Sequence, residues 1–101
     1  MKLFEVAHSR AGDKGDILSL SLIPYNEEDY DWLCQEITEQ RVKSHMKEII
    51  KGKVIRYELP NIKALNFVCY GSLLGGVTTS LAMDTHGKSL SSALLEMEIG
   101  D

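Results

Sequence analysis

The sequence predicts an α+β fold in which a mostly antiparallel sheet carries two helices on one face. Two observations favour this class: several short segments alternate between apolar and polar residues, and two longer segments carry apolar residues at helical spacing. These segments occur in the order paired strands, helix, further strands and final helix. A chain of 101 residues leaves too little sequence for a second core, so we expect residues 1–101 to form one domain.

The first two predicted strands cover residues 2–8 and 17–23. Both alternate at period two, and Pro24 ends the second because proline cannot donate to a strand ladder. Between them lies a polar, glycine-containing segment from Ser9 to Asp16, which we expect to be a loop. The two strands are therefore predicted to pair as a hairpin with a long connection.

Three further strands are predicted in the second half of the chain. Residues 54–59 alternate, which places three apolar side chains inward and Arg56 and Glu58 outward. The predicted inward residues are Ile55, Tyr57 and Leu59. Residues 64–70 are apolar on both sides, which predicts a central strand, covered on both faces or paired on both edges. Residues 77–83 alternate again and are expected to form the last strand.

Two helical regions complete the pattern. Asn26 is a good N-cap for the first region. Its apolar stripe changes phase between Ile37 and Val42, so we expect a break at Thr38, with Thr38 capping the second segment and Gly52 following its end. The apolar face of the final helix comprises Leu90, Ala93, Leu94 and Met97. Together the elements outline a ferredoxin-like sandwich without an iron–sulfur cluster, since two cysteines cannot supply four ligands.

Composition and charge exclude several classes of protein. Eleven basic and fifteen acidic residues give a net charge of -4, which repels polyanions, and no basic stripe is apparent, so no nucleic-acid partner is expected. No apolar run approaches the roughly 18 residues of a membrane span, and Glu5, His8 and Arg10 interrupt the start where a signal peptide would be apolar. We expect a cytoplasmic protein with no membrane association and with free thiols at Cys34 and Cys69.

The segment from His8 to Asp16 is the richest in chemistry. Arg10 and Lys14 could hold the negative charge of a ligand, while two glycines let backbone N–H groups approach it. Those glycines are Gly12 and Gly15. The alternative is a solvated connection whose glycines adopt turn conformations and whose carboxylates cap turns.

The same segment contains candidate catalytic groups. His8 could act as an acid or base near neutral pH, with Asp13 or Asp16 as its orienting partner. Sequence spacing alone does not establish that these side chains meet.

The remaining motifs are less specific. Residues 71–76 match neither a nucleophile elbow nor G-x-G-x-x-G, and Gly87-Lys88-Ser89 lacks the first glycine of a P-loop. Gly75 and Gly76 therefore serve a tight crossing or, alternatively, contact a ligand. Asn66, an amide in the central strand, is either a structural hydrogen-bond node or a ligand-facing group. Possible metal ligands are scattered, so neither a metal nor a cofactor is expected.

Four stretches in order carry a resemblance to a known family: H-S-R-A-G-D-K-G-D, Y-E-L-P-N with A-L-N-F, G-S-L-L-G-G-V, and S-L-A-M-D-T-H-G-K-S-L-S-S-A-L-L-E-M-E-I. Together they resemble the acyclic terpene utilisation (AtuA-like) family. The similarity is to the small ferredoxin-like domain at the carboxyl end of its longer members, which also occurs as a free-standing chain. It implies a role in the breakdown of branched acyl-CoA compounds such as those derived from citronellol and geraniol. Where the family tends to have a further glycine, this chain has Leu74.

Two functions of different classes follow from this resemblance. The first is a non-catalytic small subunit that binds a separate large AtuA-like subunit and helps to form or cover its acyl-CoA site. The second is a small oligomeric enzyme, hydratase-like or thioesterase-like, acting through His8, Asp13 and Asp16. In either case we expect a homo-oligomer, because one sheet with helices on a single face leaves the other face and the edge strands without cover.

Overall fold

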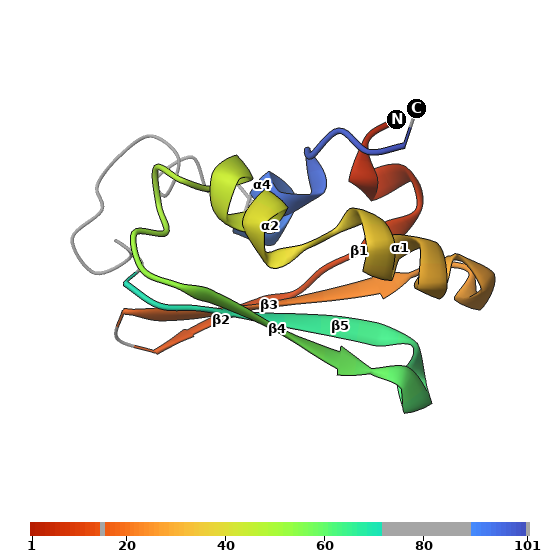
Figure 1. The fold of residues 1–101 in the computed structure, drawn as a ribbon, viewed down its shortest axis with the longest axis horizontal. Coiled ribbons are helices and arrows are strands. Elements are labelled where there is room, and N and C mark those ends of the chain that lie inside the picture. Colours follow the sequence, from red (N-terminus) through yellow and green to blue (C-terminus); the bar gives the residue numbers. More distant parts are fainter. Residues whose placement is uncertain (15, 72–89, 101) are drawn as a thin grey trace.

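The protein has two layers, a twisted sheet and a layer of helices on one of its faces (Figure 1). The computed structural model describes residues 1–14, 16–71 and 90–100. Among these residues the helices α1, α2 and α4 lie on the same side of the sheet, so the predicted α+β class is confirmed.

The sheet is antiparallel in every pairing described, with the order β1-β3-β5-β4 and β2 paired to β3 beside β1. Its strands are β1 (Ala7–His8), β2 (Ala11–Lys14), β3 (Ile17–Pro24), β4 (Val54–Leu59) and β5 (Ala64–Cys69). Because β3 and β4 are both antiparallel to β5, they run in the same direction, with the helices connecting them. This is the split β-α-β unit of ferredoxin-like folds. The predicted central strand is confirmed as β5, which is paired on both edges.

The beginning of the chain differs from the sequence prediction. Residues 2–8 do not form one strand, because Leu3–Glu5 forms a single 3-10 turn (η1) and only β1 is extended. The predicted loop from Ser9 to Asp16 is mostly strand β2, which pairs with β3 up to Lys14 opposite Ile17. The prediction took the polar residues as the sign of a loop. One face of this strand is exposed, so its side chains need not be apolar.

The connection between β3 and β4 has the predicted caps and break. The Asn26 side chain accepts a hydrogen bond from the Glu28 N–H, and the Thr38 side chain accepts one from the Arg41 N–H. These caps begin η2 (Glu27–Asp29) and α2 (Glu39–His45), and α1 (Tyr30–Glu36) lies between them. The helix α2 ends at His45, earlier than predicted, since Gly52 was expected to follow its end.

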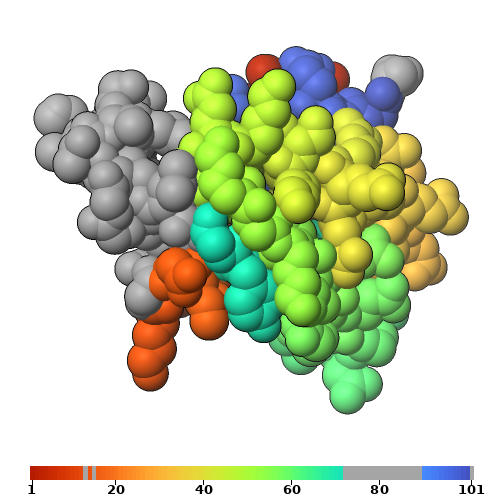
Figure 2. Space-filling model, turned by 60° about the vertical axis from the view of Figure 1, so that its left-hand side comes forward, coloured from red at the N-terminus to blue at the C-terminus, as the bar shows by residue number. Residues whose placement is uncertain are grey.

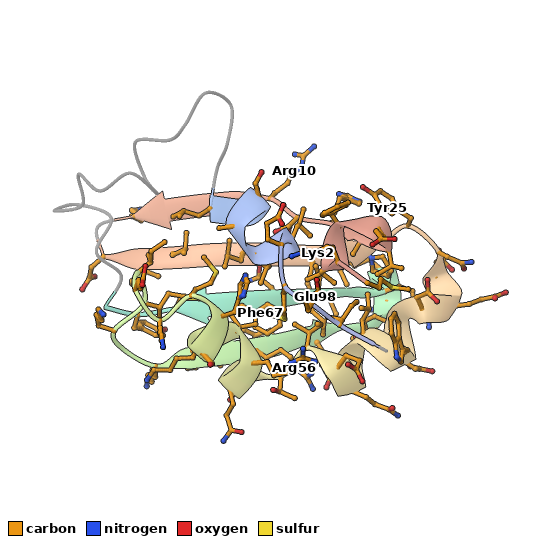
Figure 3. The ribbon with its side chains drawn as sticks, turned by 90° about the horizontal axis from the view of Figure 1, so that it is seen from above. Lys2, Arg10, Tyr25, Arg56, Phe67 and Glu98 are labelled. Carbon is orange, nitrogen blue, oxygen red and sulfur yellow. The ribbon has the colours of Figure 1, made fainter. Side chains whose placement is uncertain are left out.

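The core lies between the sheet and the helices. Phe67 on β5 is fully buried (Figure 3) in a core to which η1, α1, α2 and α4 contribute apolar side chains. The predicted helical stripes supply much of this cover, with Leu33, Val42 and Leu94 fully or almost fully buried. Truncating a buried phenylalanine to alanine costs about 3–5 kcal/mol in general, so Phe67 is central to stability.

The last helix, α4 (Leu90–Leu95), is followed by a segment that runs beside the first residues of the chain (Figure 1). The Leu3 N–H donates to the Met97 carbonyl over 2.9 Å, and the Ile99 N–H donates to the Met1 carbonyl over 2.8 Å. Lys2 also forms ion pairs with Glu96 and Glu98. The described ends of the chain are thereby held together on the helix layer.

The prediction for β4 has the correct bounds and the wrong faces. Val54 is buried and Arg56 points into the helix layer, whereas Tyr57 and Leu59 are 48% and 40% exposed. The turn η3 (Pro60–Ile62) then leads into β5. The predicted strand at residues 77–83, together with Gly15, Gly75 and Gly76, lies outside the described residues.

Candidate functional site

The side of the sheet away from the helices is the candidate functional site. We call it the open sheet face and define it by the strand and strand-flanking side chains whose register places them on that side. These are His8, Arg10, Gly12, Lys14, Ile17, Ser19, Ser21, Ile23, Lys53, Ile55, Tyr57, Leu59, Ala64, Asn66, Val68 and Tyr70. Each is exposed or half-buried, apart from Ala64.

The register aligns these residues in rows across the sheet. One complete row consists of Gly12, Ser19, Val68 and Ile55. The neighbouring row begins at Arg10, whose carbonyl accepts from the Ser21 N–H, and it continues through Asn66 to Tyr57. Side chains from residues far apart in the sequence are therefore adjacent on one surface, as cross-strand neighbours lie about 5 Å apart.

The charges on the open sheet face have a single sign. Arg10 and Lys14 lie on the first edge of the sheet, and Lys53 precedes β4 on the opposite edge. No described side chain of the open sheet face is acidic, although the chain as a whole carries a net charge of -4. Glu58, the acidic residue of β4, belongs to the other face, where it pairs with Arg56. The face therefore favours negatively charged groups.

Arg10 stands at an irregular point of the edge strand. Its N–H donates to the Ser21 hydroxyl over 2.9 Å, in place of the backbone carbonyl of a regular ladder. This interruption separates β1 from β2, and the Arg10 side chain extends outward from the edge of the sheet (Figure 3). Its guanidinium is exposed and so accessible to a partner.

The middle of the face is polar. The Ser19 hydroxyl donates to the Asn66 amide oxygen over 3.3 Å, so Asn66 is the hydrogen-bond node that the sequence predicted as one alternative. This bond leaves the amide nitrogen of Asn66 available as a donor beside Tyr57. The neighbouring apolar side chains of Ile55 and Val68 are half-buried. The centre thus combines hydrogen-bond donors with apolar area.

Aromatic rings accompany the basic groups at both ends. The His8 ring stacks on Tyr25 with ring centroids 5.3 Å apart, and the Lys53 ammonium lies 5.4 Å from the centroid of the Tyr70 ring. Stacking and cation–π contacts restrict the positions of these side chains. As residues, His8 is half-buried and Lys53 is exposed.

The structure separates the predicted catalytic groups. The backbone register places His8 opposite Ile23 and Asp13 opposite Leu18, and Asp16 lies in the turn after β2. At about 3.3 Å per residue, Lys14 at the end of the edge strand is roughly 20 Å from His8, and Asp16 lies beyond it in the turn. The partner shown for the His8 ring is Tyr25, so the arrangement offers no acid–base pair between His8 and Asp16.

The predicted ligand-binding residues that the structure describes lie on one surface. Arg10, Gly12, Lys14 and Asn66 all belong to the open sheet face, and they span two edges of β3 rather than one loop. A side chain at Gly12 would meet nothing within 4 Å, so packing does not require a glycine there and the backbone is open to an approaching partner. Spacing alone did not reveal Lys53, Tyr57 and Tyr70, because their positions depend on strands paired across the sheet.

The remaining groups form no competing site in the part of the chain that the structure describes. Cys34 and Cys69 are free thiols, as predicted, and burial raises the pKa of Cys69 to about 11, which makes it a poor nucleophile. Among the described residues, no group of three His, Cys, Asp or Glu side chains is arranged to hold a metal ion. The described helices include none that is long and apolar enough to cross a membrane.

The split β-α-β unit, the antiparallel sheet and the single helix layer define a ferredoxin-like α+β domain. More specifically, this chain belongs to the family of the AtuA ferredoxin-like domain, whose family model matches residues 1–100. The resemblance drawn from the sequence motifs is therefore confirmed. Comparisons with curated proteins and with solved structures give no match.

Proposed function

We propose that this chain is an accessory domain that binds a separate, large AtuA-like subunit and works with it in the breakdown of branched acyl-CoA compounds. Membership of the AtuA ferredoxin-like family supports this proposal, since the match extends over residues 1–100. The match covers one small ferredoxin-like domain, and the proposal assigns the catalytic role to the large subunit.

The observation that carries the proposal is the open sheet face. It combines apolar side chains that are exposed, among them Ile17, Tyr57 and Leu59, with basic side chains at its edges and the Asn66 amide at its centre. Exposed apolar area bordered by polar residues marks an interaction surface. By contrast, the separation of His8 from Asp16 gives no support to the alternative of a small acyl-CoA enzyme.

The proposal is tested by producing the chain together with the large AtuA-like subunit from the same organism. Size-exclusion chromatography with light scattering measures whether a complex forms. Turnover of a geraniol-derived acyl-CoA is then measured for the large subunit alone, the small chain alone and the mixture. We expect a stable complex, with activity that needs the large subunit. Turnover by the small chain alone would instead establish the enzyme alternative.

A further inference from the structure

We infer that the open sheet face is the surface by which this chain binds its protein partner, and that the covering surface of the partner is acidic. The inference rests on the proposed function, because the partner meant is the large AtuA-like subunit. It specifies which surface of this chain binds the partner and which charge the covering surface of the partner carries.

Basic side chains are segregated from acidic ones on the open sheet face. Arg10, Lys14 and Lys53 all belong to the open sheet face, and no described acidic side chain shares it. In a chain with fifteen acidic and eleven basic residues, this distribution is opposite in sign to the whole. Carboxylates of a partner placed over this face would find basic groups on both edges and a donor, the Asn66 amide, between them.

The charges also disfavour a second copy of this chain as the occupant. If two copies met through this face, each would bring basic groups and neither would bring a carboxylate to neutralise them. Like charges brought together in an interface cost several kcal/mol in general. Self-association through this surface is therefore the less favourable outcome, and the predicted homo-oligomer would need another surface.

The shape of the face favours a protein over a small molecule. Small-molecule sites are concave and bury most of their ligand. Two hollows of the described residues lie in the helix layer around His45 and Ala93, and between α2 and β4, where Tyr57 at the edge of the open sheet face borders the second. Figure 2 shows the helix layer beside β4, where the second of these hollows lies. The rows of the open sheet face instead form a broad surface suited to another protein surface.

Charge reversal tests this inference. The double substitution Arg10→Glu with Lys14→Glu alters the open sheet face, and Lys43→Glu with Lys47→Glu alters exposed lysines of the helix layer by the same total charge. Affinity for the large subunit is measured by calorimetry at low and at high NaCl concentration. We expect the first variant to lose about tenfold or more in affinity and the control to stay within about twofold. High salt should weaken the wild type more than the first variant.

Cross-linking tests the acidic partner directly. A carbodiimide joins lysine amines to carboxylates in contact, and mass spectrometry identifies the joined peptides. We expect Lys14 or Lys53 to be joined to Asp or Glu of the large subunit. Cross-links confined to Lys43 and Lys47 would overturn the assignment.

The other outcomes are distinguishable. If the complex forms but both double variants bind alike, the open sheet face is not the interface, while the proposed function stands. If the wild type forms no complex, the proposed function fails and the inference fails with it. Two findings would show a different occupant and also overturn the inference: a homodimer that Arg10→Glu with Lys14→Glu dissociates, or a single-stranded RNA oligonucleotide bound as tightly as the large subunit.

Discussion

Arg56 shows how one side chain decides which face of a strand is buried. Its guanidinium donates to the carbonyls of Cys34 and Ile37, the latter over 3.0 Å, and it pairs with Glu58 over 2.8 Å. The last carbonyls of a helix lack partners within it, and a cation at that end also interacts favourably with the helix dipole. Arg56 therefore stabilises the end of α1 from the neighbouring strand.

The first prediction concerns Arg56. Replacing it with alanine leaves two carbonyls at the end of α1 without their donors, so we expect the free energy of unfolding to fall by about 2 kcal/mol. Urea denaturation followed by circular dichroism measures this change. Lys43→Ala, an exposed residue of α2, is the control and should change stability by no more than about 0.5 kcal/mol. Equal effects of the two substitutions would contradict the structural role of Arg56.

At the residue scale, the candidate site was predictable only in part. Arg10, Gly12 and Lys14 were found from the sequence because charged side chains and glycines are concentrated in one segment, which was predicted to be a loop. Asn66 was found because it is an amide in an apolar strand. The faces of β4 were predicted wrongly, since Ile55, Tyr57 and Leu59 make one side of the strand apolar. The other side faces the helices because Arg56 donates to carbonyls at the end of α1 that lie far away in the sequence.

At the scale of elements, two glycines fix how the segment before β4 approaches the end of β5. A Cβ on Gly71, whose φ is 64°, would lie 2.8 Å from the Gly52 nitrogen, and a Cβ on Gly52 would lie 2.5 Å from the Tyr70 carbonyl oxygen. The two backbones are joined here by the hydrogen bond from the Gly52 N–H to the Tyr70 carbonyl, 2.9 Å long. The crossing therefore needs glycine on both sides.

The second prediction compares glycines. Gly71→Ala forces both a left-handed residue and a backbone clash, so we expect it to destabilise the protein by about 2 kcal/mol. Gly12→Ala meets nothing within 4 Å and should stay within about 0.5 kcal/mol of the wild type. Thermal unfolding of the two variants side by side measures the difference. A tolerated Gly71→Ala would show that the crossing can relax.

Elements with strong local signals were the ones that the sequence predicted well. Thr38 marked the break between α1 and α2 because a hydroxyl at an N-cap accepts from the helix backbone, which is a local interaction. The strand β2 was missed because it is stabilised by pairing with β3, and a polar sequence does not show this pairing. The ends of a helix or strand that depend on residues far away in the sequence cannot be predicted from a short stretch of sequence.

At the scale of the whole molecule, most acidic side chains and the basic side chains of the open sheet face lie on different parts of the surface. Most of the described acidic residues belong to the helix layer and its turns, including the cluster Glu27, Glu28 and Asp29 at the start of η2, while Asp16 lies in the turn after β2. This charge separation orients the domain in an electric field. The domain would therefore approach a negatively charged partner surface with its sheet side first. The fold class itself was predictable because the order of periodic segments restricts the possible layers.

The third prediction concerns the whole core at alkaline pH. Burial raises the pKa of Cys69 on β5 to about 11 from an ordinary 9.0, and burial raises the pKa of Tyr30 on α1 to about 12 from 10.0. Between these values the unfolded chain has released protons that the folded protein still holds. Since the unfolded state then binds fewer protons, stability decreases as pH rises. This contribution is complete below about pH 9 and is lost progressively up to about pH 12.

Both groups face the same core, between the sheet and the helices, so their ionisation should unfold the domain as a unit. We expect the urea midpoint of the wild type to fall more between pH 8 and pH 11 than that of a variant with Tyr30→Phe and Cys69→Ala, because the variant lacks both groups and keeps the other titrating residues. Each protein is compared with itself at pH 8, which removes any change in baseline stability from the smaller side chain at position 69. If the two midpoints decline in parallel, the alkaline loss comes from surface lysines and tyrosines, and the buried thiol and phenol do not couple protonation to folding.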